Sequence, residues 1–425
     1  MSISFKKLTT IFVLYITVFS FPLSSAIGAS LPKTTADKPS TKLYGVNRSG
    51  AEFAPETLPG KPGVDFEYPT DKARFEAFVS RGLTLMRVPI LWERVQPKLN
   101  SGLNPEALLS LNYLLDTAES AHLQVILDLH NYGRYYGRPL EVSDARSLAH
   151  FWVTLITALG NKQALYGVEL MNEPHDLPGG EDAWAKIVQQ TVSAIRQYNN
   201  KTTILVPGYS WQSARFWQDN NKSLIISDPA NKLLYSAHQY FDSNFTGTYG
   251  ESTTGDASRG SELLAPFVSW LKENNLKGII TEYGAPSTDP VALSMMRNML
   301  STVDNSDVLV GAVYWASGPR WGSYQLSVEP DSTGKFPGQI DILQDFPTRT
   351  NPVAIPRGLK KGDFVKFEKN LITYYVDTNG LHPLVNTKVY QDYKIKNKTA
   401  RVYTRTDSVA KYTVRFTPIA NISGE

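Results

Sequence analysis

Two glutamates stand where apolar segments of this sequence give way to polar ones. Glu173 lies in the stretch GVELMNEPHD (167–176), which begins as an apolar run suited to a buried strand and then becomes polar and charged. Glu282 stands in the same way near the end of GIITEYG (278–284), 109 residues further on. Two facing carboxyl groups suit cleavage of a glycosidic bond, because one can protonate the leaving oxygen while the other attacks the anomeric carbon or activates water.

Short apolar segments that alternate with helical patterns must position these carboxyl groups. The apolar segments predict strands, which are LYGVN, TLMRVPI, LQVILDLH, LYGVELM, TTILVPG, LLYSAHQY, GIITEYG and VLVGAVYW. The clearest helical patterns between them are residues 71–82, 104–121, 181–199, 262–275 and 289–303. Nearly continuous apolar strands separated by helices indicate a parallel sheet that is covered by helices.

The spacing of the strands favours a closed barrel. The residues at or near the eight strand ends are Asn47, Arg87, His130, Glu173, Gly208, His238, Glu282 and Trp315, and the gaps between them are 40, 43, 43, 35, 30, 44 and 33 residues. Eight units of this size over residues 43–350 predict an α/β fold of the (β/α)8 TIM barrel type. A doubly wound open sheet is the main alternative, but it normally carries a Gly-rich phosphate turn after its first strand, and VNRSGAEF is not such a turn.

The barrel prediction places the two glutamates at the ends of the fourth and seventh strands, which face each other across one mouth. A lone glutamate at a strand end can equally serve a salt bridge or a helix cap. Two at these positions favour a catalytic pair. Asn172 directly precedes Glu173 and is suited to binding a sugar hydroxyl, and Arg87 is a charge at the end of an otherwise apolar strand that can orient a carboxylate.

Further polar and aromatic residues fall at other strand ends of the same barrel. His130 and His238 follow the third and sixth strands, where their rings can donate hydrogen bonds. Tyr240 can donate to the carboxylate of Glu282, and Trp315 at the eighth strand can form an aromatic floor for one sugar ring.

This set of residues resembles glycoside hydrolase family 5, which belongs to the clan whose acid/base and nucleophile lie on strands 4 and 7. The resemblance covers about residues 43–350, and the motifs HNYGRYYG, MNEPHD and YWASGPRWGSYQLSVEP are most similar to the endo-β-1,4-glucanase (cellulase) branch found in bacteria and fungi. It implies that Glu173 is the acid/base, that Glu282 is the nucleophile, and that the reaction retains the anomeric configuration without a metal or an organic cofactor. One departure is Tyr283 in ITEYGAP, where this family often has Phe or Thr after the nucleophile.

Several other residues in the expected loops are candidate sugar-binding subsites. They are Asn47, Tyr135, Tyr136, His175, Trp211 and Trp321. Loop aromatics beside a carbohydrate cleft either stack on sugars or brace the loop, and both alternatives are open for these residues. Trp92, Trp152 and Trp270 fall on or beside helices, where core packing is the better interpretation.

The N-terminal end is typical of an export signal. Lys6 and Lys7 precede a mostly apolar run of about thirteen residues, and SSAIGAS offers small residues for cleavage. We therefore expect a signal peptide over residues 1–29, a disordered linker over 30–42 and a secreted protein, extracellular or periplasmic. An uncleaved anchor is the alternative, although the run is short for a membrane span. The sequence contains no cysteine, which excludes disulfides, thiolate nucleophiles and cysteine zinc sites.

The pattern changes near residue 350. Residues 351–425 hold 13 Lys and Arg against 6 Asp and Glu, a net charge of +7, whereas the whole chain carries only +3. Asn379–Gly380 between two apolar segments predicts a hairpin, and the alternation of Tyr412, Val414 and Phe416 with polar residues predicts a strand. We expect a small antiparallel β module that stabilises the barrel, with binding to a polysaccharide or to an anionic cell surface as alternatives.

Taken together, these patterns predict an endo-acting β-1,4-glucanase. We expect a β-linked polysaccharide as the substrate, no nucleic-acid partner, no membrane span and a monomer. A β-mannanase or xyloglucanase of the same family remains open, because catalytic residues do not encode the substituents of the sugar ring. A carbohydrate-binding protein without catalysis is the alternative from another class, but it would require the loss of Glu173 or Glu282.

Overall fold

The computed structural model describes residues 42–348 and four shorter segments, 363–367, 370–377, 380–383 and 402–405. The expected signal peptide and nearly all of the expected linker lie outside these residues. Among the described residues, no helix combines the length and the apolar character that crossing a membrane requires.

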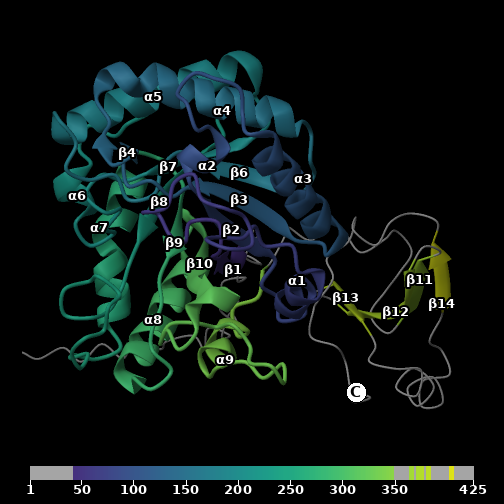
Figure 1. The fold of residues 1–425 in the computed structure, drawn as a ribbon. Helices are drawn as coiled ribbons and strands as arrows, with labels where there is room; N and C mark the ends of the chain where they lie inside the picture. Colours follow the sequence, from purple (N-terminus) through teal and green to yellow (C-terminus); the bar gives the residue numbers. More distant parts are fainter. Residues whose placement is uncertain (1–41, 349–362, 368–369, 378–379, 384–401, 406–425) are drawn as a thin grey trace, which may run out of the picture. The chain divides into compact units, whose positions relative to one another are not determined.

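Eight parallel strands close into a barrel, as the strand spacing predicts (Figure 1). Around the barrel the strands follow the order β1-β10-β9-β8-β7-β6-β3-β2. Their bounds are β1 Leu43–Arg48, β2 Leu85–Ile90, β3 Gln124–Leu129, β6 Leu165–Glu169, β7 Thr203–Pro207, β8 Leu233–His238, β9 Gly278–Glu282 and β10 Leu309–Ser317. Two further strands, β4 Arg134–Tyr135 and β5 Arg138–Pro139, form a small hairpin after β3.

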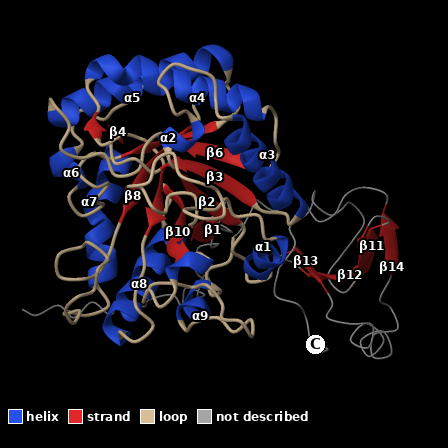
Figure 2. Ribbon diagram, viewed as in Figure 1, coloured by secondary structure: helices blue, strands red, loops and turns tan. Residues whose placement is uncertain are grey.

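Helices surround the strands on the outside (Figure 2). The longer ones are α1 Lys72–Val79, α3 Pro105–Ser120, α4 Ala145–Leu159, α5 Gly180–Tyr198, α7 Arg259–Glu273 and α8 Pro290–Asn305. The short ones are α2 Trp92–Val95, η1 Val142–Asp144, α6 Trp217–Asn220, η2 Pro319–Trp321 and α9 Gln339–Leu343. Asn104 and Asp289 cap α3 and α8 by accepting from free backbone N–H groups of the first turn.

Two layers inside the barrel explain how the strands position the site. Seven apolar side chains, one from each of seven barrel strands, form a separate buried cluster that consists of Leu43, Leu85, Ile126, Leu205, Leu234, Ile279 and Val313. Because side chains two residues apart lie on the same face of a strand, the residues two positions later form the next layer. That layer includes Arg87, Asp128, Thr281 and Trp315, and it also includes Asn47, which lies four positions after Leu43 and pairs with Arg87. Polar groups therefore stand directly above an apolar plug.

The fifth unit of the barrel has almost no helix of its own. The helix that follows β7 is the four-residue α6, and its buried Trp217 packs against Phe267 and Trp270 of α7, with ring centroids 4.3 and 5.5 Å apart. Side chains of a neighbouring helix therefore cover the place where a longer helix would lie. Trp92 and Trp152 are fully buried and Trp270 nearly so, which confirms the core interpretation of these residues.

The seam between the first and last barrel strands depends on glycine. Leu43 of β1 pairs with Gly311 of β10, and Gly45 pairs with Val313 and with Leu85 of β2. A Cβ on Gly311 would lie 1.9 Å from the carbonyl oxygen of Leu43, and a Cβ on Gly45 would lie 1.5 Å from that of Leu85. The strands can approach one another here only because neither residue carries a side chain.

The C-terminal segments form a separate four-stranded sheet in the order β13-β12-β11-β14. Its strands are β11 Phe364–Phe367, β12 Asn370–Asp377, β13 Gly380–Pro383 and β14 Val402–Arg405. The pairing of Asp377 with Gly380 confirms the predicted hairpin. The sheet is not wholly antiparallel, since β11 and β14 run parallel, and the strand predicted around Tyr412 lies outside the described residues.

Candidate active site

Arg87 stands at the centre of a group of buried acids. Its guanidinium donates to Oε2 of Glu169 at 2.5 Å and to Oε1 of Glu282 at 2.7 Å, and it lies 3.0 Å from Oδ2 of Asp128. Burial works against the charge of Arg87, but these three carboxylates raise its pKa overall, so it stays protonated. A fully buried cation therefore holds Glu282 in place and favours its ionised form.

Two amide side chains complete the surroundings of Arg87. Asn47 and Asn172 each accept a hydrogen bond from the guanidinium, at 2.8 and 2.7 Å. Asn47 is completely buried and donates to the backbone carbonyl of Thr281 at 2.8 Å, so it cannot reach a substrate. The interpretation of Asn47 as a sugar subsite is therefore corrected: this residue ties β1 to β9 beneath the site.

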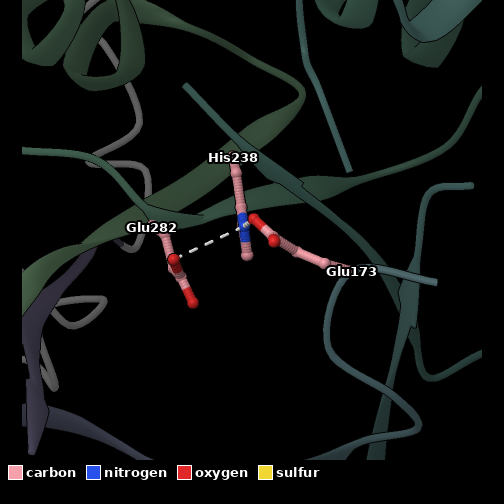
Figure 3. A group of neighbouring side chains, drawn as sticks. All are labelled: Glu173, His238 and Glu282. Carbon is pink, nitrogen blue, oxygen red and sulfur yellow. Dashed lines mark hydrogen bonds and ion pairs between the residues drawn. The ribbon is translucent and has the colours of Figure 1, made fainter. Parts of the chain in front are cut away.

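Glu173 and Glu282 meet on either side of His238 (Figure 3). Nδ1 of His238 lies 2.8 Å from Oε1 of Glu173, with which it shares a hydrogen bond, and 3.6 Å from Oε2 of Glu282. One nitrogen or oxygen atom from each of the three side chains lies within 4.8 Å of the other two. Such a group can bind a cation in geometric terms, but hydrolysis by paired carboxyl groups requires none.

The two carboxyl groups have different surroundings. Tyr240 donates to Oε2 of Glu282 at 3.0 Å, and Arg87 binds the other oxygen, so both oxygens of Glu282 are held by donors. Burial raises the pKa of Glu282, but the positive charge of Arg87 opposes this rise. Burial and the nearby charge of Glu282 raise the pKa of Glu173 well above its ordinary value. Glu173 is thus the group that retains a proton, and Glu282 is the better anion.

Both histidines of the site are neutral. Burial lowers the pKa of His130 to about 4 and that of His238 well below its usual range. Nδ1 of His130 donates to Oδ2 of Asp128 at 2.6 Å, which leaves Nε2 to accept from the hydroxyl of Tyr132 at 3.1 Å. Trp315 lies parallel to the ring of His130, with centroids 5.5 Å apart. The predicted catalytic and supporting residues thus lie in one connected site, which consists of Arg87, His130, Asn172, Glu173, His238, Tyr240, Glu282 and Trp315.

The candidate subsite aromatics differ in how far they reach this site. Trp211 is 48% exposed and stacks on His175, with centroids 4.5 Å apart, and Nδ1 of His175 donates to the carbonyl of Glu173 at 2.8 Å. Trp321 is half-buried and meets Trp315 edge-on at 5.7 Å. His175 and Trp211 therefore lie beside Glu173, and Trp321 lies beside Trp315, while the role of these residues as sugar subsites stays a prediction.

Tyr135 and Tyr136 have other roles than the sequence suggested. The hydroxyl of Tyr135 donates to the carbonyl of Gln96 at 2.9 Å, and its buried ring packs against Trp92. Tyr136 is exposed, but its hydroxyl donates to the carbonyl of Pro97 at 3.3 Å. Both tyrosines hold the loop after β3 against the segment after α2. The interpretation of Tyr135 as a sugar subsite is corrected, because its ring is buried, whereas that of the exposed Tyr136 stays a prediction.

Four residues of the site were missed in the sequence. Asp128 and Glu169 lie within apolar strands. A buried acid in such a run needs a cation as its partner, so the acids themselves were the signal that the sequence offered. Tyr132 follows His130 by two residues and is 38% exposed. Its ring centroid lies 6.1 Å from that of His175. Gln212 gives no local signal, because its partners are spread along the chain.

A closed (β/α)8 barrel with two carboxyl groups of unequal acidity at its mouth defines this chain as a glycoside hydrolase. The sequence profile of "Cellulase (glycosyl hydrolase family 5)" matches residues 46–320. The chain belongs to this family.

Relatives with curated names and solved structures agree with the assignment. The chain is 32% identical to the probable endo-beta-1,4-glucanase B of Neosartorya fischeri, over 76% of this chain and 97% of that protein. The endoglucanase Cel5A of Pseudomonas stutzeri in complex with cellobiose is 38% identical, has a TM-score of 0.68 and covers 74% of this chain and 99% of its own. XacCel5A in complex with cellopentaose is 37% identical, with a TM-score of 0.68, and covers 72% of this chain and 99% of its own.

Proposed function

We propose that this chain is a secreted, retaining endo-β-1,4-glucanase that hydrolyses internal bonds of cellulose or related β-glucans by double displacement. The single observation that carries the mechanism is the close approach of the two carboxyl groups, whose nearest atoms lie within 4.8 Å of one another. Retaining enzymes hold their carboxyl groups about 5–5.5 Å apart, whereas inverting enzymes need about 6.5–9.5 Å to admit a water molecule. The substrate class is supported by the names of the relatives and by their cellobiose and cellopentaose complexes.

The first step forms a covalent intermediate. An oxygen of Glu282 attacks the anomeric carbon and the bond from that carbon to the leaving oxygen breaks, while Glu173 gives its proton to the leaving oxygen. Arg87 and Tyr240 hold Glu282 as an anion aimed into the site, and the raised pKa of Glu173 keeps its proton available.

The second step reverses the roles. Glu173, now ionised, takes a proton from a water molecule whose oxygen attacks the same carbon, and the ester bond to Glu282 breaks. The configuration is inverted twice and therefore retained. The neutral ring of His238 beside Glu173 introduces no fixed positive charge that would keep this carboxyl group ionised.

Two variants test the roles of the carboxyl groups. Glu282→Ala should abolish turnover, and added azide should restore it with an α-glycosyl azide as the product, because azide replaces the missing nucleophile. Glu173→Ala should lose far more activity on polysaccharide than on aryl glycosides with good leaving groups, since the latter need no proton. An inactive Glu282→Ala that azide does not rescue, or equal losses of Glu173→Ala on both substrates, would contradict the assignment.

A substrate panel tests the specificity. Carboxymethyl-cellulose, mixed-linkage glucan, xyloglucan, mannan and xylan are compared by initial rate and by the sizes of the products. We expect the highest rate on the unsubstituted β-1,4-glucan and products that shorten gradually, as internal cleavage requires. Preferential cleavage of mannan or xyloglucan would favour the alternative specificities. No hydrolysis of any polysaccharide would favour a binding protein.

A further inference from the structure

Three consecutive residues of the loop after β7 have a backbone conformation that residues with a side chain seldom adopt. Ser210, Trp211 and Gln212 have φ angles of 60°, 55° and 54°. Left-handed conformations normally occur as single residues and often at glycine, because the Cβ atom crowds the following carbonyl oxygen. Such a run persists only where the surrounding contacts require it, which makes those contacts informative.

The contacts of Gln212 join the two residues that share the acid/base hydrogen bond. Its side-chain Oε1 accepts from the backbone N–H of Glu173 at 2.7 Å, and its main-chain carbonyl accepts from the backbone N–H of His238 at 2.8 Å. One residue therefore fixes the backbone on both sides of the 2.8 Å contact between Glu173 and His238.

The orientation of the Gln212 amide is determined by its other end. Nε2 donates to Oε1 of Glu169 at 3.0 Å, and to the carbonyl oxygen and the hydroxyl of Ser236 at 3.2 and 3.1 Å. A flipped amide would bring its oxygen against the Glu169 carboxylate and the Ser236 carbonyl, which are acceptors only, and its NH₂ against the N–H of Glu173. The side chain thus has a single orientation in which its bonds are satisfied.

The neighbours of Gln212 attach the same loop to the segment that follows the acid/base. The N–H of Ser210 donates to the carbonyl of Pro174 at 2.8 Å, and Trp211 stacks on His175 at 4.5 Å. Three successive residues of the loop, 210–212, therefore contact three successive residues of the acid/base segment, 173–175. Glu173 itself has a φ of 42°, so its own backbone also depends on being held.

We propose that Gln212 is a positioning residue for proton transfer, which holds Glu173 against His238 at the distance and angle from which Glu173 serves the leaving oxygen. Gln212 is completely buried, so its side chain is out of reach of a substrate and acts through Glu173 and His238. The proposal rests on the function proposed above, in which Glu173 is the acid/base.

The test uses Gln212→Met, which keeps the length of the side chain and removes its hydrogen bonds. Rates on carboxymethyl-cellulose, which needs a proton on its leaving oxygen, are compared with rates on 2,4-dinitrophenyl cellobioside, which does not. A 2-deoxy-2-fluoro derivative of the same cellobioside titrates Glu282, so that both rates are expressed per competent site. We expect kcat/KM to fall on the order of 10- to 100-fold for the polysaccharide and less than about 3-fold for the aryl glycoside.

The control is Gln339→Met, because Gln339 is also completely buried and donates to the backbone carbonyls of Ala285 and Gln325, which lie outside the Glu173 and His238 contacts. The loss in kcat/KM per titrated site, relative to the wild type, should be the same on the polysaccharide and on the aryl glycoside. Ser236→Ala is a gentler second variant, which removes one partner of the Gln212 amide and should change the ratio of the two rates in the same direction. It decides the question if Gln212→Met yields no titratable sites.

The outcomes separate this inference from the function on which it rests. Equal losses on the two substrates in Gln212→Met, or a leaving-group effect of the same size in Gln339→Met, would overturn the positioning role. A wild-type enzyme that cleaves neither substrate, or a Glu173→Ala variant without a leaving-group effect, would instead overturn the proposed function. If Gln212→Met, like Glu173→Ala, loses more activity on the polysaccharide than on the aryl glycoside, the result supports both the positioning role and the proposed function.

Discussion

Arg87 is the cation that pairs with three acids inside the barrel. Its charge is shared among Asp128, Glu169 and Glu282, and its side chain is fully buried. Removing the cation would leave several carboxyl groups buried without a partner, which they can relieve only by binding protons or by unfolding. Catalysis and stability therefore depend on the same guanidinium.

Arg87→Met is expected to lower the free energy of unfolding by about 3–5 kcal/mol, which is the usual result of breaking a buried ion pair. Urea unfolding followed by tryptophan fluorescence measures it. The matched control is Arg297→Met, whose ion pair with Asp345 has an N–O distance of 2.7 Å but involves side chains that are 49% and 52% exposed. The control should lose no more than about 1 kcal/mol. Similar losses in the two variants would contradict the importance of burial.

The neutral state of His130 makes stability depend on pH. Its pKa is about 4 in the folded protein against 6.5 in an unfolded chain, so between these values the unfolded chain binds one proton more. The stability that His130 contributes is complete above pH 6.5 and is lost as the pH falls through about 4.

Replacing His130 with Gln keeps a donor near Asp128 and removes the titration. The stability difference between wild type and H130Q should therefore change by about 1.4 kcal/mol per pH unit between pH 6.5 and 4, with the wild type losing more as the pH falls. Urea unfolding at several pH values measures the slope. The exposed His122 provides the control H122Q, and an H130Q slope no different from that of H122Q would disprove the linkage.

At the scale of elements, the strands were predictable and one helix was less so. The barrel strands are nearly continuous apolar runs, which the sequence displays directly. The α4 segment ARSLAHFWVTLITAL buries nine of its fifteen residues, and Arg146 is the one Lys, Arg, Asp or Glu among the other six, so its polar face is weakly marked in the sequence.

The same contrast explains which site residues could be predicted. Glu173 and Glu282 interrupt apolar runs at strand ends, where a change of polarity marks them. Asp128 and Glu169 lie inside such runs, and only their pairing with Arg87 in three dimensions gives them a role. Gln212 could not have been identified, because its four partner residues are separated from it by 24 to 43 positions along the chain.

The seam between β1 and β10 should tolerate no side chain. Gly311→Ala places a Cβ 1.9 Å from the carbonyl oxygen of Leu43, so one strand must move away and break its pairing. We expect a loss of more than about 3 kcal/mol of unfolding free energy, or a failure to fold. Gly102→Ala is the control, since a Cβ there meets nothing within 4 Å, and it should be neutral or slightly stabilising. Measured melting temperatures that are equal for the two variants would contradict this account of the seam.

At the scale of the whole molecule, the C-terminal β module is a second, smaller sheet besides the barrel. Tyr374 and Tyr375 of β12 are buried within the described sheet, which favours packing over a role as an exposed sugar platform. The predicted boundary near residue 350 is compatible with the barrel, because the backbone of Tyr44 in β1 exchanges hydrogen bonds of 2.9 and 3.0 Å with the hydroxyl of Thr348.

A chain cut after residue 355 retains that contact and tests the module. We expect a lower melting temperature and unchanged retention on insoluble cellulose, because we infer that the module supports the barrel and does not bind the substrate. A chain with an unchanged melting temperature and weaker retention would indicate a carbohydrate-binding module instead.

The barrel closes between its first and last strands, and this has a consequence for how the chain is made. Lys42 and Leu309 lie 267 positions apart, yet the amine of Lys42 donates to the carbonyl of Leu309 at 2.6 Å. Until β10 has left the ribosome, β1 and β9 each present an unpaired edge, and such edges invite pairing with other chains. Every shorter intermediate is thus an open sheet at risk of aggregation. Once residues 309–317 are complete, β10 pairs with both β1 and β9, and the barrel then has no unpaired strand edge.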